Sequence, residues 1–127
     1  MIDYARGGDL LEAYGTARAS FDGDAWVALF TEDAEYHEDP FGAPHVGHNA
    51  LRSFLLEAAN RQRDVDFTVE RHWVSGSTVL AAWHASWTRR SDGRVERIAG
   101  FLTADLGDDG LISRLHEWWM AAPTTAG

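Results

Sequence analysis

The hydrophobic pattern of this chain changes its period once, after residue 64, and this change constrains the fold more than any other feature. Three segments before that point carry apolar side chains at the spacing of amphipathic helices, and beyond it apolar side chains alternate with polar side chains. The alternating part is divided by the turn sequences SGS, SDG and GDDG. Helices followed by antiparallel strands predict an α+β domain with its helices packed on one face of a curved sheet.

Three helices are predicted in the first half. The first covers residues 8–21, where Asp9 serves as the N-cap with Glu12 three residues on, as in a capping box. A short second helix starts at an Asp24 cap, and a third spans residues 48–60. The apolar stripe of the third helix consists of Ala50, Leu51, Phe54, Leu55 and Ala58.

Four strands are predicted in the second half, over residues 65–74, 78–90, 94–106 and 111–120. Because side chains alternate between the two faces of a strand, one face of the first of them should carry Val65, Phe67, Val69 and Trp73. By the same alternation, one face of the last strand carries Leu115, Glu117 and Trp119, and the other carries Arg114, His116 and Trp118.

Composition narrows the function classes. A chain of 127 residues with 45% apolar side chains is long enough for one domain with a real core. The absence of cysteine excludes a disulfide framework, a thiolate metal site and a thiol nucleophile. A formal charge of −9 disfavours nucleic acid and anionic membranes as partners. No apolar run suits a membrane span and no signal sequence is evident, so we expect a cytoplasmic protein.

Two adjacent acids in the stretch YHEDPFGAPHVG, Glu38 and Asp39, are candidate catalytic bases. In an extended strand only one of them can face the interior. Glu38 shares its face with Ala34 and Tyr36, the more apolar set, so we expect Glu38 to point inward. Asp39 precedes a proline, which favours a turn and makes the alternation less certain there, so Asp39 remains the second candidate. The alternative is a partly exposed acid at the end of a strand.

The segments WVALFTEDAEYHEDPFGAPHVGHNALRSFL (26–55) and DDGLISRLHEWW (108–119) resemble the nuclear transport factor 2-like superfamily. Within it, the chain is most similar to SnoaL-like polyketide cyclases and steroid delta-isomerases, over about residues 9–120 of a single domain, 1–127. The resemblance implies a cone-shaped α+β barrel, in which a curved antiparallel or mixed sheet wraps against about three helices around a deep apolar pocket. Members include isomerases, cyclases, dehydratases, epoxide hydrolases and non-catalytic binding proteins, so the fold alone does not define the function.

Comparison with the delta-isomerases implies a catalytic base and a hydrogen-bond donor. It also indicates that one of their site residues is missing from this chain. Their aspartate base stands directly before a proline, as Asp39 does, whereas an ungapped count from LFTED puts Glu38 at the base position. Tyr14 matches their phenolic hydrogen-bond donor, although a tyrosine packed in the core is the alternative. Leu102 stands where they carry a neutral aspartic acid, so the complete isomerase oxyanion hole is not expected.

Comparison with limonene-epoxide hydrolases implies a second inward acid. Glu117 falls where they place a catalytic carboxylate, but Trp83 and Ala85 replace their arginine and second acid. The alternative is an ion pair between Glu117 and Arg89 or another base. Ionising both acids in one dry pocket is unfavourable, so one of them should stay protonated near neutral pH. A protonated acid beside a carboxylate suits general acid/base chemistry. The expected pocket walls are Phe30, Tyr36, Phe54, Trp83, Trp87, Leu102 and Trp119.

These features predict an enzyme without cofactor or metal, of isomerase, cyclase or dehydratase type, acting on an apolar ring-containing molecule. The alternative is a non-catalytic binding module with the same pocket. His37, His45 and His48 lack the regular spacing of metal ligands. On the outer face of the sheet we expect His72, His84, His116 and Trp118. An outer face of this composition predicts a homodimer formed sheet to sheet.

Overall fold

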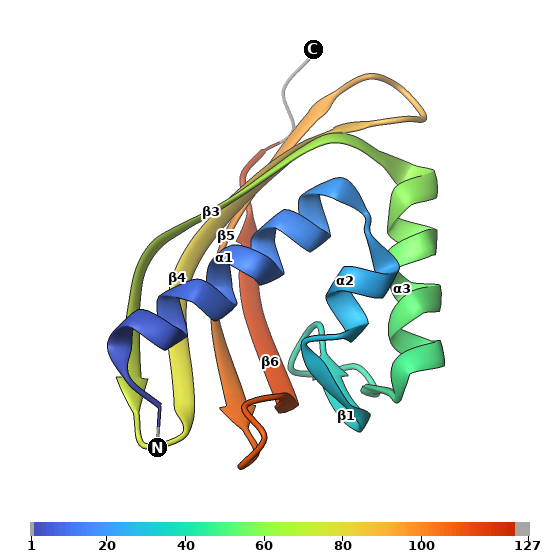
Figure 1. The fold of residues 1–127 in the computed structure, drawn as a ribbon. Coiled ribbons are helices and arrows are strands. Elements are labelled where there is room, and N and C mark those ends of the chain that lie inside the picture. The colour runs from blue at the N-terminus through green and yellow to red at the C-terminus, as the bar shows by residue number, and fades with distance from the viewer. Residues whose placement is uncertain (1, 124–127) are drawn as a thin grey trace.

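The computed structural model describes residues 2–123 and confirms the predicted α+β architecture. Within these residues three helices pack against one face of a six-stranded mixed sheet that does not close into a barrel (Figure 1). The elements are α1 (Tyr4–Ser20), α2 (Gly23–Val27), β1 (Phe30–His37), β2 (His45–Val46), α3 (His48–Arg61), β3 (Gln62–Ser75), β4 (Thr78–Arg89), β5 (Val95–Leu106) and β6 (Ile112–Ala121). Among the described helices, none is long and apolar enough to cross a membrane.

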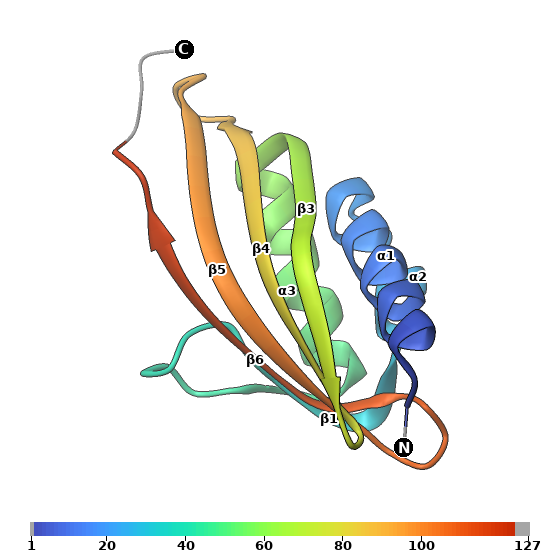
Figure 2. The ribbon, with the colours of Figure 1, turned by 90° about the vertical axis from the view of Figure 1, so that its left-hand side faces the viewer.

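The sheet has the strand order β2-β1-β6-β5-β4-β3. Strands β3 to β6 form the predicted antiparallel meander, and β1 joins its edge by pairing in parallel with β6. The long strands bend together, and all three helices lie on the same side of them, giving the cone shape expected of the fold (Figure 2). The concave side of the sheet and the helices enclose the core, in which Trp26, Leu51 and Leu102 are fully buried.

Two predicted helix caps are wrong, since each helix starts earlier than its predicted cap. Asp3 caps α1, with its Oδ1 accepting a hydrogen bond from the backbone N–H of Arg6 at 2.8 Å. Asp9 therefore lies inside the helix. Gly7, inside the helix, lies close against β3, since a Cβ at this position would come 2.9 Å from Val74 Cγ2. The absence of a side chain at Gly7 therefore lets α1 pack against this strand.

The second helix is likewise capped by Asp22 rather than the predicted Asp24. Its Oδ1 accepts a hydrogen bond from the backbone N–H of Ala25 at 3.1 Å. The helix then ends at Val27, and Phe30 already belongs to β1.

Strand β3 contains an irregularity that overturns part of the predicted alternation. Its register with β4 shifts between Val69 and Arg71, which exchanges the two faces beyond that point. Trp73 consequently lies on the outer face, beside Phe101, with ring centroids 6.0 Å apart. His72, predicted on the outer face, instead lies against the start of α1, with Nε2 2.9 Å from the backbone oxygen of Tyr4.

Candidate functional site

A cavity of about 210 Å³ opens between the end of α3, the start of β3 and strands β4 to β6. It exceeds the roughly 150 Å³ of an engineered apolar cavity that binds benzene, so it has room for one or two small rings. Its lining consists of Arg18, Tyr36, Glu38, Phe54, Ala58, Arg61, Gln62, Val65, Phe67, Trp83, Ala85, Trp87, Glu96, Ile98, Glu117, Trp119 and Ala121.

Glu117 is the buried acid of this cavity. It lies on β6 opposite Leu102 of β5, and only 6% of its surface is exposed. Its Oε1 accepts hydrogen bonds from the hydroxyl of Tyr14 at 2.5 Å and from that of Tyr36 at 3.1 Å. The Nη1 of Arg18 lies 3.7 Å from the same oxygen. Three groups from α1 and β1 thus hold one oxygen of the carboxyl group.

The other oxygen of Glu117 remains available to a ligand. Within residues 2–123 no side chain or backbone group forms a hydrogen bond to Oε2. This oxygen is also not among the described polar atoms that are buried without a partner. Because Glu117 lines the cavity, we conclude that Oε2 reaches the open space inside it.

The surroundings of Glu117 shift its proton affinity. Burial raises the pKa of its carboxyl group above the ordinary value of 4.5, because a charge loses hydration in the interior. Arg18 and the hydroxyls of Tyr14 and Tyr36 act in the opposite direction without cancelling the rise, and the charge of Glu38 adds to it. Burial also raises the pKa of both phenols, so they remain hydrogen-bond donors near neutral pH.

Arg18 is a site residue that the sequence prediction missed. Its Nη1 donates to the hydroxyls of Tyr14 at 3.2 Å and Tyr36 at 3.1 Å. Burial acts to lower the pKa of this guanidinium, but its contacts with the two tyrosines and Glu117 raise it overall, so Arg18 stays charged. The available signal was its position four residues after Tyr14, on the same helix face.

The alternative ion pair of Glu117 is formed with another base, Arg18, and not with Arg89. The guanidinium of Arg89 lies 3.2 Å from Asp92 and 3.4 Å from Glu96. It belongs to the hairpin between β4 and β5, whereas the base beside Glu117 is Arg18 of α1. Arg89 is also not among the residues that line the cavity.

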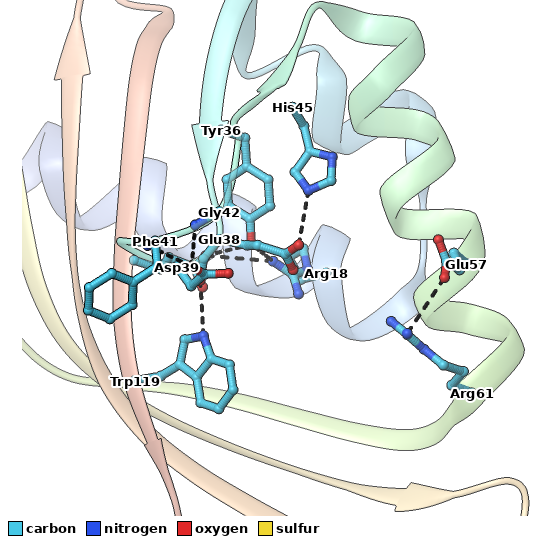
Figure 3. Close-up of polar contacts among 11 residues, drawn as sticks. Arg18, Tyr36, Glu38, Asp39, Phe41, Gly42, His45, Glu57, Arg61 and Trp119 are labelled. Carbon is cyan, nitrogen blue, oxygen red and sulfur yellow. Dashed lines mark hydrogen bonds and ion pairs between the residues drawn. The ribbon is translucent and has the colours of Figure 1, made fainter.

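Glu38 and Asp39 have different surroundings, and Glu38 is partly exposed just beyond the end of its strand, as in the alternative prediction. Glu38 follows β1 and lines the cavity, with 44% of its side chain exposed and its Oε1 3.1 Å from His45 Nε2. The backbone oxygen of Glu38 accepts a hydrogen bond from Trp119 Nε1 at 2.9 Å, so His45 and Trp119 lie on opposite sides of Glu38 (Figure 3).

Asp39 Oδ1 instead accepts from the backbone N–H groups of residues 41 and 42, at 2.8 and 2.7 Å. Its carboxylate stabilises the turn and does not line the cavity.

The remaining predicted residues divide between the cavity and the packed core. Five predicted wall residues line the cavity: Tyr36, Phe54, Trp83, Trp87 and Trp119. Phe30 and Leu102 do not, because both are fully enclosed in the core. Tyr14 is also buried, and its hydroxyl is directed at Glu117 rather than at the cavity. Its geometry is that of a group that positions the acid.

The clustered histidines make separate contacts. His45 bonds Glu38, His48 Nε2 lies 3.0 Å from the backbone oxygen of Phe30, and His37 contacts Glu35. Within residues 2–123 no group of three His, Asp or Glu side chains is arranged to hold a metal ion.

The sequence model of the SnoaL-like domain matches residues 11–115, and the chain therefore belongs to the SnoaL-like domain family. A comparison with curated protein sequences gives no match. Three solved structures illustrate the shared fold. The epoxide hydrolase/cyclase-like enzyme SalBIII, described in pyran ring formation in the polyether salinomycin, is 20% identical, with a TM-score of 0.83 over 94% of this chain and 95% of that one.

The second is the Δ5-3-ketosteroid isomerase of Mycobacterium sp., 21% identical, with a TM-score of 0.79 over 94% of this chain and 98% of that one. The third is a computationally designed 17-OHP binder, 17% identical, with a TM-score of 0.77 over 92% and 98% of the two chains. At these identities the similarity establishes the ketosteroid isomerase-like fold and leaves the reaction open.

Proposed function

We propose that this protein is a cofactor-free acid/base enzyme of isomerase, cyclase or dehydratase type, acting on a small, mostly apolar, ring-containing molecule. One observation carries the proposal. Glu117 lies buried in an aromatic cavity, with one carboxyl oxygen held by two tyrosine hydroxyls and the other open to a ligand. Family membership and isomerase and cyclase-like relatives support the same reaction class.

In this proposal Glu117 moves the proton. A raised pKa brings the acid and its conjugate base closer to equal population near neutral pH, which favours proton transfer in both directions. Tyr14 and Tyr36 hold Oε1, so the proton enters and leaves at Oε2, the oxygen that meets the substrate. The two phenols are positioning residues, because they act through the carboxyl group.

Glu38 is the second carboxylate of the proposed mechanism. Its half-exposed side chain lines the cavity beside His45, which suits proton exchange between the substrate and solvent. Asp39 is the weaker candidate, because its Oδ1 already accepts two backbone hydrogen bonds. Dehydration, cyclisation and isomerisation all use one group that removes a proton and one that returns it.

The test is turnover of ring ketones, phenols and lactones, screened first with the wild-type protein. For any substrate found, Glu117→Gln should lower kcat by about 100-fold or more, because the amide cannot transfer the proton, while the geometry is kept. Glu38→Gln should have a smaller effect and Asp39→Asn the smallest. The matched control is Glu57→Gln, a surface acid of α3 that pairs with Arg61 (Figure 3). Full activity of Glu117→Gln would refute the assignment.

The second candidate function is a non-catalytic binding module. It is favoured by Leu102, which cannot donate a hydrogen bond at the position of the isomerases' neutral acid, and by the likeness to a designed binder. A ¹³C NMR titration of the Glu117 carboxyl group separates the two functions. A pKa near that of a free glutamic acid, together with tight ligand binding and no turnover, would establish the binding module.

We also propose that the protein forms a homodimer through the outer face of the sheet. Trp73 and Trp118 lie on this face, 37% and 41% exposed, and no described helix covers it (Figure 2). Exposed aromatic side chains gathered on an uncovered sheet face are typical of a contact surface.

A further inference from the structure

The guanidinium of Arg18 uses only part of its hydrogen-bonding capacity. All its polar contacts with described residues come from Nη1, which meets Tyr14, Tyr36 and Glu117. Nε and Nη2 form no hydrogen bond within residues 2–123, and neither is among the described polar atoms that are buried without a partner. Since Arg18 lines the cavity, this Nε–Nη2 edge is accessible to a ligand there.

The accessible edge is held in a fixed orientation. The two tyrosine hydroxyls anchor Nη1, and the guanidinium carbon lies 5.4 Å from the ring centre of Trp26 and 5.2 Å from that of Phe54. Aromatic contacts of this kind stabilise a cation without using its N–H donors. The two N–H donors are therefore already ordered in the free protein, so a ligand can bind without the entropy cost of fixing them.

We propose that the Nε–Nη2 edge of Arg18 binds a carboxylate on the substrate, which makes the natural ligand a carboxylic acid with one or two small rings. Two parallel N–H donors match the two oxygens of a carboxylate, and an arginine edge forms this bidentate pair better than any other side chain. The ring system then packs against Phe54, Phe67 and Trp83, of which the last two stack with centroids 5.2 Å apart. This inference rests on the proposed function, because it names the substrate of the same cavity.

The charge of Glu117 would compete with such a ligand, and its protonation removes that competition. Burial raises the pKa of Glu117, so the proton that neutralises it is more readily held than on a free glutamic acid. A bound carboxylate would favour the protonated form further, by repulsion. The other ionisable groups facing Glu117 are Tyr14 and Tyr36, which stay neutral, and Glu38, which lies nearer the solvent.

The test compares an acid with its neutral isostere by isothermal titration calorimetry. Wild-type protein should bind 2-naphthoate about tenfold to a hundredfold more tightly than 2-naphthamide, as expected for a charge-assisted bidentate contact. Arg18→Met keeps the apolar stem and removes the edge, so this preference should disappear. The control is Arg52→Gln, which removes an equal charge from an exposed arginine of α3 that does not line the cavity and should keep the preference.

Two results would overturn the inference: equal affinity for acid and amide in the wild-type protein, or a preference that survives Arg18→Met. Absence of binding across benzoate, cyclohexanecarboxylate and 2-naphthoate would also overturn it. If circular dichroism shows that Arg18→Met is unfolded, Arg18→Lys takes its place, since lysine keeps the charge but not the planar edge and should lose most of the preference.

The outcome is distinguishable from that of the proposed function. Selective carboxylate binding without turnover of any acid would support the ligand class and refute the enzyme. Turnover of a neutral ketone that depends on Glu117, with no preference for binding acids, would support the enzyme and refute the ligand class.

Discussion

At the scale of single residues, the site depends on how four side chains share their protons. Tyr14 and Tyr36 each donate to Glu117 while receiving a hydrogen bond from Arg18, so the cation polarises both phenols toward the carboxyl group. Charge-assisted hydrogen bonds of this kind are stronger than neutral ones. The network accounts for a buried acid in an otherwise apolar interior, because Glu117 Oε1, both tyrosine hydroxyls and Arg18 Nη1 all form hydrogen bonds or close polar contacts with one another.

The raised pKa of Glu117 predicts a specific dependence of stability on pH. Because the folded state holds this proton more tightly than the unfolded state, the contribution of Glu117 is complete below its ordinary value of 4.5 and is lost as pH rises through the folded value. The free energy of unfolding of the wild type, minus that of Glu117→Gln, should therefore fall with increasing pH. Its steepest slope should approach about 1.4 kcal/mol per pH unit.

Urea denaturation of both proteins at pH values from acid to mildly alkaline measures this difference. Glu57→Gln serves as the control, because Glu57 is exposed on α3 and its difference curve should be nearly flat. If the free energy of unfolding of the wild type, minus that of Glu117→Gln, instead rises with pH, the folded protein prefers the carboxylate form of Glu117 over the acid.

At the scale of elements, the cavity depends on how closely neighbouring strands approach. Gly100 of β5 pairs with Trp83 of β4 and with Trp119 of β6, and the indole of Trp83 lies across its backbone. A Cβ at this position would come 2.6 Å from Trp83 Cζ2 and would also meet the backbone oxygen of Trp118. Glycine is therefore needed for Trp83 to form its part of the cavity wall.

Gly100→Ala should consequently destabilise the protein by about 1–3 kcal/mol, the usual cost of overpacking, and should weaken ligand binding by displacing Trp83. Urea denaturation and calorimetric titration measure the two effects. Ala99→Ser is the control, because it changes the neighbouring, exposed position of the same strand and should alter neither. Unchanged stability of Gly100→Ala would show that β5 and the indole rearrange at little cost.

The elements themselves could be predicted from the sequence, because periodicity reports which side chains face a core. Alternation correctly paired Ala34 with Tyr36, which are both buried, whereas Glu38 follows the end of β1 and lines the cavity with its side chain 44% exposed. Alternation failed in β3, since the register shift after Val69 leaves no trace in the pattern of residue types. By local rules Asp9, with Glu12 in a capping box, is a better cap than Asp3, yet the helix starts at Tyr4 and its first turns lie close against β3.

The candidate site was less predictable than the fold. Glu117 was identified through its inward face and the family resemblance, whereas Arg18 carries no local sign of burial. Its partners Tyr36 and Glu117 lie on strands that reach α1 only in the folded protein. A polar network that joins distant segments is a tertiary property, and helix spacing indicates only the Tyr14–Arg18 part of it.

At the scale of the whole molecule, the two faces of the sheet have different surroundings. The concave face is covered by the helices, and the outer face carries aromatic side chains in contact with one another. His116 stacks between His37 and Trp118, and Trp73 packs beside Phe101. Burial and the neighbouring His37 lower the pKa of His116, so the imidazole of this residue is largely neutral near neutral pH.

A second copy of the chain is the partner that we expect on this face, and a double substitution of Trp73 and Trp118 by aspartate tests it. Sedimentation velocity should find the wild type as a dimer and the variant as a monomer, because the new charges would be buried without partners. Since each chain carries a net charge of −9, dimer formation should strengthen as salt is added.

Leu56→Asp is the matched control, because it places a charge at an exposed apolar position of α3, on the helix side, and should leave the dimer intact. A monomeric wild type at every concentration would leave the outer aromatic face without this role, while the cavity on the other side of the sheet would keep its own residues and chemistry.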